Sequence, residues 1–160
     1  MKKHFIIFED DIDTDTIIKL VTEIQQYDNV CLYFATNGGY VTDMMFLIDV
    51  LNNHPKIEVI LNSYLGSAGT RLLTKYKGKL KIAKTFEYFL FHKQDRKVYQ
   101  LRKQVLNSKK LIGISEASNV KDGNKLLELG IFNEKQYKKY MKGKDVVIFK
   151  KDIKWNIKKL

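Results

Sequence analysis

Apolar and polar positions change period several times between residues 1 and 92. Short apolar runs, typical of strands buried on both faces of a sheet, alternate with segments whose apolar residues recur every three to four positions, as in helices. Strands are predicted at 3–9, 29–36, 56–63, 79–84 and 87–92. Helices are predicted at 13–28, at 40–54 and after residue 67. This alternation predicts an α/β fold with a mostly parallel sheet and helical crossovers.

The pattern changes after residue 97. One long amphipathic helix is predicted over about 97–118, with apolar residues at 98, 101, 105, 111, 112 and 114. Two helical pieces follow over 122–145, and a last element closes the chain over 146–160. Because no repeat, low-complexity tract or linker interrupts the sequence, we expect a single domain over 1–160.

Composition narrows the function classes. The hydrophobic content is 44% and no run of 18 apolar residues occurs, so no transmembrane helix is expected. The start "MKKHFIIFEDD" is too short in apolar residues for a signal peptide, which predicts a cytoplasmic protein with no membrane role. Cys31 lies in the apolar run "VCLYFA" and is expected to be buried. No Cys/His cluster has zinc spacing, and we expect no metal.

Charge is unevenly distributed. The net charge is +11, but residues 1–80 hold 8 Lys and Arg against 10 Asp and Glu (−2), whereas residues 81–160 hold 21 against 8 (+13). A basic half can attract nucleic acid or anionic surfaces. Lysine outnumbers arginine 26 to 3, however, and arginine is the better base reader, so a solvated lysine surface is the favoured interpretation.

Three features fit one chemistry. Ser67 lies between small residues in "LGSAGT", at a strand-to-helix turn that can present a hydroxyl near a helix N-terminus. His92 ends the strand "EYFLFH", whereas His4 and His54 carry no such context. The paired glycines of "TNGGY" after a strand let the backbone approach a ligand and expose amide groups.

These segments resemble the Clp protease proteolytic subunit (ClpP) family. "FATNGGYVTDMMFLIDVLNN" is similar to its segment around "NSPGG" and the following helix, "LGSAGTRLLT" to its nucleophile turn, and "YFLFHK" to its strand ending in the catalytic histidine. The separations also match, with 29 residues from Gly38 to Ser67 and 25 from Ser67 to His92. Wider relatives are the crotonase-like enzymes and signal peptide peptidase A.

The resemblance implies a ClpP/crotonase-like fold, a repeated β-β-α superhelix with a handle-type helix and a C-terminal helical closure. It implies a serine endopeptidase, without a cofactor, that acts on peptides or unfolded proteins. Ser67 would be the nucleophile, His92 the general base, and the backbone amides of Gly38 and Ala68 the oxyanion hole. The handle helix further implies a homo-oligomer, expected to be a ring.

The family also uses an aspartate that orients the histidine. Laying "DIKWNIKK" over the family segment that carries it puts Lys159 at that position, and an ammonium cannot accept the imidazole N–H. Either Asp145 or Asp152 reaches His92 through a different alignment, or a lysine replaces the histidine as base, as in the Ser-Lys arrangement of signal peptide peptidase A. Lys159 therefore predicts slow cleavage of activated esters or short peptides.

Further departures leave other functions open. The chain starts almost at its first strand, so the segment that docks an unfoldase in the family looks absent, and the family's "NSPGG" has become "ATNGG". A catalytically inactive relative with an assembly or binding role fits these differences. The remaining alternatives are a crotonase-like acyl-CoA enzyme and a nucleic-acid binder that uses the basic half, although that half lacks an arginine-aromatic platform.

Overall fold

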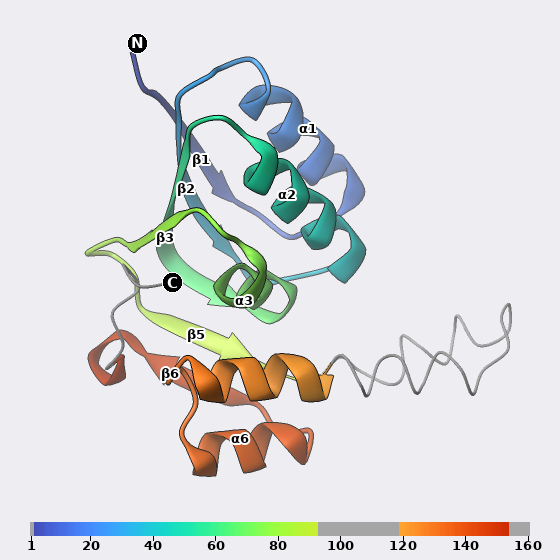
Figure 1. Ribbon diagram of the computed structural model, residues 1–160, viewed down its shortest axis with the longest axis vertical. Coiled ribbons are helices and arrows are strands. Elements are labelled where there is room, and N and C mark those ends of the chain that lie inside the picture. Colours follow the sequence, from blue (N-terminus) through green and yellow to red (C-terminus); the bar gives the residue numbers. More distant parts are fainter. Residues whose placement is uncertain (1, 93–118, 154–160) are drawn as a thin grey trace, which may run out of the picture. The chain divides into compact units, whose positions relative to one another are not determined.

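The computed structural model describes residues 2–92 and 119–153 (Figure 1). The chain divides into two compact units, a sheet unit of Met1–Leu90 with Val147–Leu160 and a second unit of Phe91–Val146. The helix predicted over 97–118 lies outside the described residues, and so does Lys159.

The sheet follows the strand order β1-β2-β3-β5-β6, with β4 paired to β3. The strands β1, β2 and β3 are parallel, and each lies beside the next one in sequence, as the βαβ pattern predicts. All the strands predicted from apolar runs are present. Their bounds are β1 (His4–Glu9), β2 (Val30–Thr36), β3 (Ile57–Gly66), β4 (Lys79–Ile82), β5 (Tyr88–Phe91) and, within the last predicted element, β6 (Val146–Phe149).

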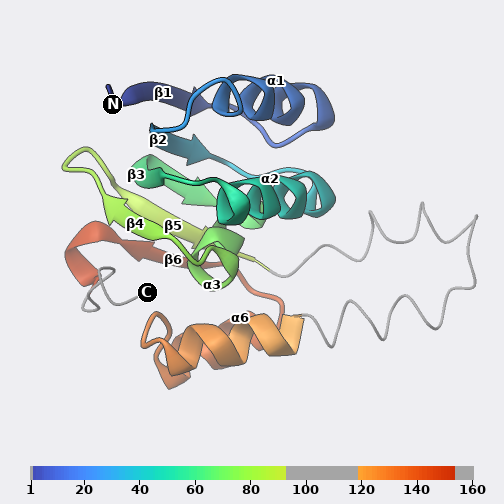
Figure 2. The same ribbon diagram turned by 45° about the horizontal axis from the view of Figure 1, so that its top comes forward.

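The crossover helices of the sheet unit cover one face of the sheet (Figure 2). They are α1 (Thr14–Ile24), α2 (Val41–Asn53) and a 3-10 turn, η1 (Ser67–Arg71), that leads into the short α3 (Leu72–Lys75). Asp13 caps α1 by accepting a hydrogen bond from the Thr16 N–H at 2.8 Å. The buried face of α1 is formed by Ile17, Leu20, Val21 and Ile24, which recur at the three- to four-residue spacing of a helix.

On the side away from β2, the strand β3 pairs first with β4 and then with β5. Its residues 58–61 pair with β4, and its residues 64–66 pair with β5. Ser63, between these two ladders, has a φ of 54°, and the pairing with β2 also shifts register here. This irregularity lets the second half of β3 change partner without ending the strand.

The strand β6 runs antiparallel to β5. The Lys150 N–H, just after β6, donates to the Glu87 carbonyl, just before β5, at 2.7 Å. The rings of Tyr88 and Phe149 also meet edge to face, with centroids 6.3 Å apart. The end of β6 therefore lies beside the beginning of β5.

The second unit has an aromatic core. The Phe132 ring packs against Phe91 at 4.9 Å and against Tyr140 at 5.5 Å between centroids. The two predicted helical pieces are present, over 119–128 and as α6 (Glu134–Met141), which Asn133 caps through a reciprocal hydrogen bond with Gln136. Among the described residues, no helix combines the length and apolar character needed to cross a membrane.

Candidate active site

Ser67 occupies a strained turn at the carboxyl end of β3. It begins the 3-10 turn η1 directly after the strand, and its φ of 48° lies in the left-handed region that side chains other than glycine rarely adopt. Such strain is found where a surrounding structure enforces a functional geometry, as in the nucleophile turn of many hydrolases. The tight corner predicted around this serine is confirmed.

The glycine turn after β2 packs directly against the Ser67 turn. A Cβ built on Gly38 would overlap the Ser67 Cβ and would lie 2.9 Å from the Ser67 Oγ and 3.1 Å from the Ala68 nitrogen. A Cβ on Gly66 would lie 2.6 Å from the Asn37 carbonyl oxygen. Only a hydrogen fits at Gly38 and Gly66, so the turn after β2 lies in direct contact with the Ser67 turn. Gly38, Ser67 and Ala68, which the family resemblance assigned to one site, therefore lie together.

The Gly38 amide already has a partner in this conformation. Its N–H donates to the hydroxyl oxygen of Thr36 at 3.0 Å, and the Thr36 side chain is fully buried. The Gly38 carbonyl accepts from the Ile12 N–H at 2.7 Å, which ties the turn to the loop after β1. Thr36 was not singled out in the sequence, although a threonine two residues before a glycine is a known source of such local hydrogen bonds.

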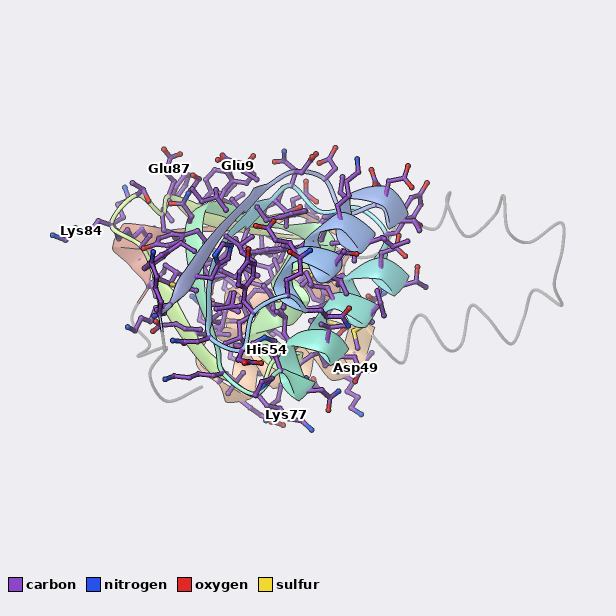
Figure 3. The ribbon with its side chains drawn as sticks, turned by 90° about the horizontal axis from the view of Figure 1, so that it is seen from above. Glu9, Asp49, His54, Lys77, Lys84 and Glu87 are labelled. Carbon is purple, nitrogen blue, oxygen red and sulfur yellow. The ribbon has the colours of Figure 1, made fainter. Side chains whose placement is uncertain are left out.

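Two of the three histidines lie at the wrong end of the strands for Ser67. His54 precedes β3, and its Nε2 is 2.8 Å from the Tyr27 carbonyl oxygen; His4 begins β1 and stacks on the Tyr27 ring at 3.6 Å between centroids. The strand β3 separates His54 from Ser67 by roughly 30 Å. Figure 3 shows Glu9, at the end of β1, and His54 on opposite sides of the sheet unit.

His92 directly follows β5, and Asp145 directly precedes β6, both within the second unit. The antiparallel ladder that begins at Glu87 and Lys150 places Tyr88 beside Phe149. Extended by one residue beyond the end of β5 and one before the start of β6, the same register would set His92 opposite Asp145. Directly opposed residues of an antiparallel pair have Cβ atoms about 5 Å apart and side chains on the same face.

Asp152 follows the other end of β6. It belongs to the 3-10 turn η2 (Lys150–Asp152), whose first residue hydrogen bonds to Glu87 at the beginning of β5. His92 follows the end of that strand. The register of the ladder therefore favours Asp145 over Asp152 as a partner for His92.

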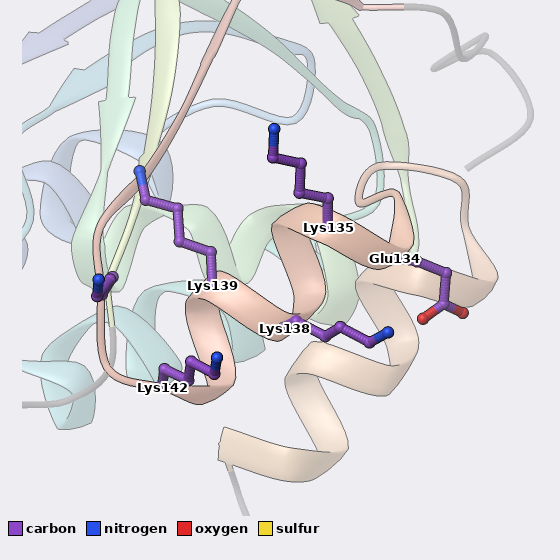
Figure 4. Close-up of a pocket in the computed structure, with 6 residues that line it drawn as sticks. Glu134, Lys135, Lys138, Lys139 and Lys142 are labelled. Atoms are coloured by element: carbon purple, nitrogen blue, oxygen red, sulfur yellow. The ribbon is translucent and has the colours of Figure 1, made fainter.

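A lysine-lined hollow of about 520 Å³ lies on α6. Figure 4 shows its lysine side chains spread apart along the helix rather than converging on one point. It is lined by Glu134, Lys135, Lys138, Lys139, Lys142 and Lys144 and holds no serine, threonine, cysteine or histidine. Spreading is expected of like charges in solvent, which fits the favoured interpretation of the basic half as a solvated surface.

An ion-pair cluster on the sheet was not predicted from the sequence. The Glu58 carboxylate on β3 contacts the ammonium groups of Lys3 and Lys81, each at 2.6 Å, and its side chain is only 12% exposed. Hydrogen bonds from these two lysines lower the pKa of Glu58 to about 2. Cys31 is buried nearby on β2, as predicted, and burial raises the pKa of its thiol. The sequence feature that could have indicated this cluster is Glu58, a single glutamate within the apolar run "KIEVIL".

No family model and no curated protein matches this sequence. Among solved structures, the ClpP1 N165D mutant from Listeria monocytogenes superposes with a TM-score of 0.66 at 13% identity, over 93% of this chain and 84% of that one. The chain has a ClpP-like fold. The ClpP protease catalytic domain from Plasmodium falciparum superposes with a TM-score of 0.50 at 22% identity, over 63% of this chain and 61% of that one.

The ClpP-like fold confirms the resemblance drawn from the sequence motifs. The chain spans about three fifths of the length of the Plasmodium structure. At these identities the likeness establishes the fold, and the chemistry has to be argued from the residues of the site.

Proposed function

We propose that this ClpP-like chain is a serine endopeptidase acting on peptides or unfolded proteins. Ser67 is the nucleophile and His92 the general base, and the backbone amides of Gly38 and Ala68 stabilise the oxyanion. The strained turn of Ser67 and Ala68, packed against Gly38, is the observation that carries the proposal. A left-handed serine lowers the stability of the fold, and a purely structural role for Ser67 does not explain why this conformation is kept.

The proposed chemistry assigns one task to each group. His92 takes the proton of the Ser67 hydroxyl as the oxygen attacks the scissile carbonyl, and it later gives that proton to the leaving amine. The negative charge on the tetrahedral intermediate is stabilised by the backbone N–H of Ala68 and by that of Gly38, which first has to leave the Thr36 hydroxyl. His92 is the favoured base because His4 and His54 belong to the amino end of the strands.

Asp145 is the favoured third member. The β5–β6 register supports it, because its extension past the ends of the two strands would bring the carboxylate of Asp145 opposite His92. A carboxylate there would accept the second imidazole N–H, fix the tautomer and stabilise the imidazolium. Under this proposal a lysine at 159 does not weaken the triad, because position 159 has no part in it.

A fluorophosphonate probe tests the nucleophile, since only an activated serine reacts with it. We expect wild type to label and Ser67→Ala to give no label. Asp145→Asn should slow labelling by up to about 10⁴-fold, as loss of a triad aspartate does. Asp152→Asn is the matched control and should leave the rate unchanged, as should Lys159→Asp.

A second candidate, a catalytically inactive protein with a binding or assembly role, is favoured by one observation. The Gly38 N–H is engaged by Thr36 and has to turn from that hydroxyl before it can meet an oxyanion. If no probe labels wild type under any condition while the fold is intact, this second function replaces the first. If Asp152→Asn alone slows labelling, the peptidase stands and the register argument is wrong.

A further inference from the structure

The strand β1 forms one end of the sheet and pairs with β2 on one side only in the described part of the chain. The His4 N–H points toward β2, where it donates to the Asn29 carbonyl at 2.8 Å. Main-chain groups of successive strand residues point in opposite directions. The N–H and C=O groups of Phe5, Ile7 and Glu9 therefore face away from β2, along an open edge.

The side chains along this edge are unusually apolar for an exposed strand. Phe5 is 61% exposed and Ile7 is 74% exposed, on the sheet face opposite α1 and α2. Natural proteins normally protect an open edge with a charge, a proline or a bulge within the strand. Here the central residues of the edge carry none of these, and the charges are placed at its two ends.

The sequence of the edge is self-complementary in charge. It reads "KKHFIIFEDD", with lysines before the apolar centre and acids after it. A two-fold axis perpendicular to the sheet at Ile6 makes β1 antiparallel to its own copy. Phe5 then faces Ile7 of the second copy on the exposed face, and the backbone of Lys3, whose ammonium contacts Glu58, lies opposite Glu9.

This register also satisfies the open main-chain groups. Residues 5 and 7 become a hydrogen-bonded pair, and so do residues 3 and 9, because the outward-facing groups belong to the odd-numbered residues. With the axis moved to Ile7, Phe5 would face Glu9, and an aromatic ring would meet a carboxylate. The two-fold axis has to keep each side chain on its own face of the sheet. Of the two axes, the one at Ile6 pairs apolar residues with apolar residues and basic residues with acidic residues.

The geometry points to β1 as a self-association surface whose partner is a second copy of this chain. The two sheets join edge to edge through antiparallel β1 strands, centred on Ile6. This isologous contact is independent of the proposed peptidase activity, because it uses neither the Ser67 turn nor the second unit. The contact is short, so we expect a weak dimer.

Sedimentation of the full chain over about 1 µM to 1 mM tests the contact. We expect Ile7→Lys, which puts a charge in the centre of the edge, to weaken dimerisation at least about tenfold. At a concentration where wild type is mostly dimeric, the average mass of this variant should then lie closer to that of the monomer. Ile18→Lys is the matched control, since Ile18 on α1 is also exposed, at 53%, and this variant should associate as wild type does.

Cross-linking tests the register. Phe5→Cys mixed with Ile7→Cys should form a disulfide-linked dimer faster than either variant alone, because opposed residues of a hydrogen-bonded pair lie about 5.5 Å apart at Cα. The native Cys31 is buried and adds little background. A monomeric wild type at every concentration, an Ile7→Lys variant with the mass of wild type, or equal cross-linking in the mixture and the single variants would each overturn the proposal.

Discussion

The two ends of the parallel sheet are built from different kinds of interaction. At the carboxyl end of β2 and β3, bare glycines pack against a serine in a left-handed conformation, and a backbone amide depends on one buried hydroxyl. The amino end of the same strands has an ion pair from Lys3 to Glu58, stacked rings of His4 and Tyr27, and ordinary backbone geometry. The difference shows that strain is concentrated where the proposed chemistry lies, while the other end stabilises the fold.

The largest effect is expected at the carboxyl end, from Gly39→Ala. Gly39 has a φ of 142°, and a Cβ there would overlap the Ile12 carbonyl oxygen. We expect the free energy of unfolding to fall by at least about 3 kcal/mol in denaturant titrations. Gly130→Ala is the control: its φ is also positive, at 69°, but no atom lies within 4 Å of the added Cβ, so about 1 kcal/mol is expected. Equal losses would mean that conformation, rather than contact with Ile12, decides the cost.

Glu58→Gln tests the amino end. Removing the carboxylate leaves two lysines without their shared partner and should lower stability by about 1–3 kcal/mol, with no change in the rate of probe labelling. Glu128→Gln breaks an exposed pair with Lys125 and should have almost no effect. A change in labelling with Glu58→Gln would show that the two ends are not separate.

The same carboxylate sets an acid dependence. Because the folded-state pKa of Glu58 is about 2, against an ordinary value of 4.5, its stabilising contribution is fully present above pH 4.5 and is lost as the pH falls toward 2. Wild type should therefore lose stability over this range more steeply than Glu58→Gln. Parallel pH profiles for the two proteins would contradict the assignment.

Thr36→Val should separate stability from activity at the carboxyl end. Valine keeps the buried volume but removes the acceptor of the Gly38 N–H, so stability should fall by about 1–2 kcal/mol. The released amide can then donate to an oxyanion, and labelling should become about 2- to 10-fold faster. Thr22→Val, at an exposed hydroxyl on α1, is the control and should change neither. Slower labelling would mean that Thr36 holds the Gly38 turn in its active form.

The smallest expected effect has the opposite sign. Ser67→Gly relieves a left-handed residue and should raise stability by about 0.5–1 kcal/mol while abolishing labelling. Ser63→Gly relieves a similar φ of 54° and should give the same gain with labelling retained. A loss of stability in Ser67→Gly would show that the serine side chain stabilises its turn.

Much of the fold could be predicted because its signals are local. The apolar run of β2 and the helical face of α1 each identify their element from a few neighbouring residues. The Ser67 turn was predictable for the same reason, since a serine among small residues lies between a strand and a helix. Its φ and its contact with Gly38 agree with that prediction.

The rest depends on pairing between distant segments. The proposed pairing of Asp145 with His92 rests on the antiparallel register between β5 and β6, and nothing local in "KGKDVVIF" gives that register. Aligning the chain end with the family instead drew attention to Lys159. The Lys3–Glu58–Lys81 cluster was missed because it joins residues of three different segments. The handle helix, the ring assembly and the absence of the unfoldase-docking segment remain predictions.

The strand order also determines how the sheet can grow during synthesis. β1, β2 and β3 are neighbours in both sequence and space, so each new strand finds its partner already made as the chain leaves the ribosome. β4 and then β5 pair with successive parts of β3, which has already been made. β6 comes last and adds beside β5 in the opposite direction. A nascent chain paused before residue 146 would hold the Ser67 turn but would still lack β6, the strand on which the proposed Asp145–His92 pairing depends.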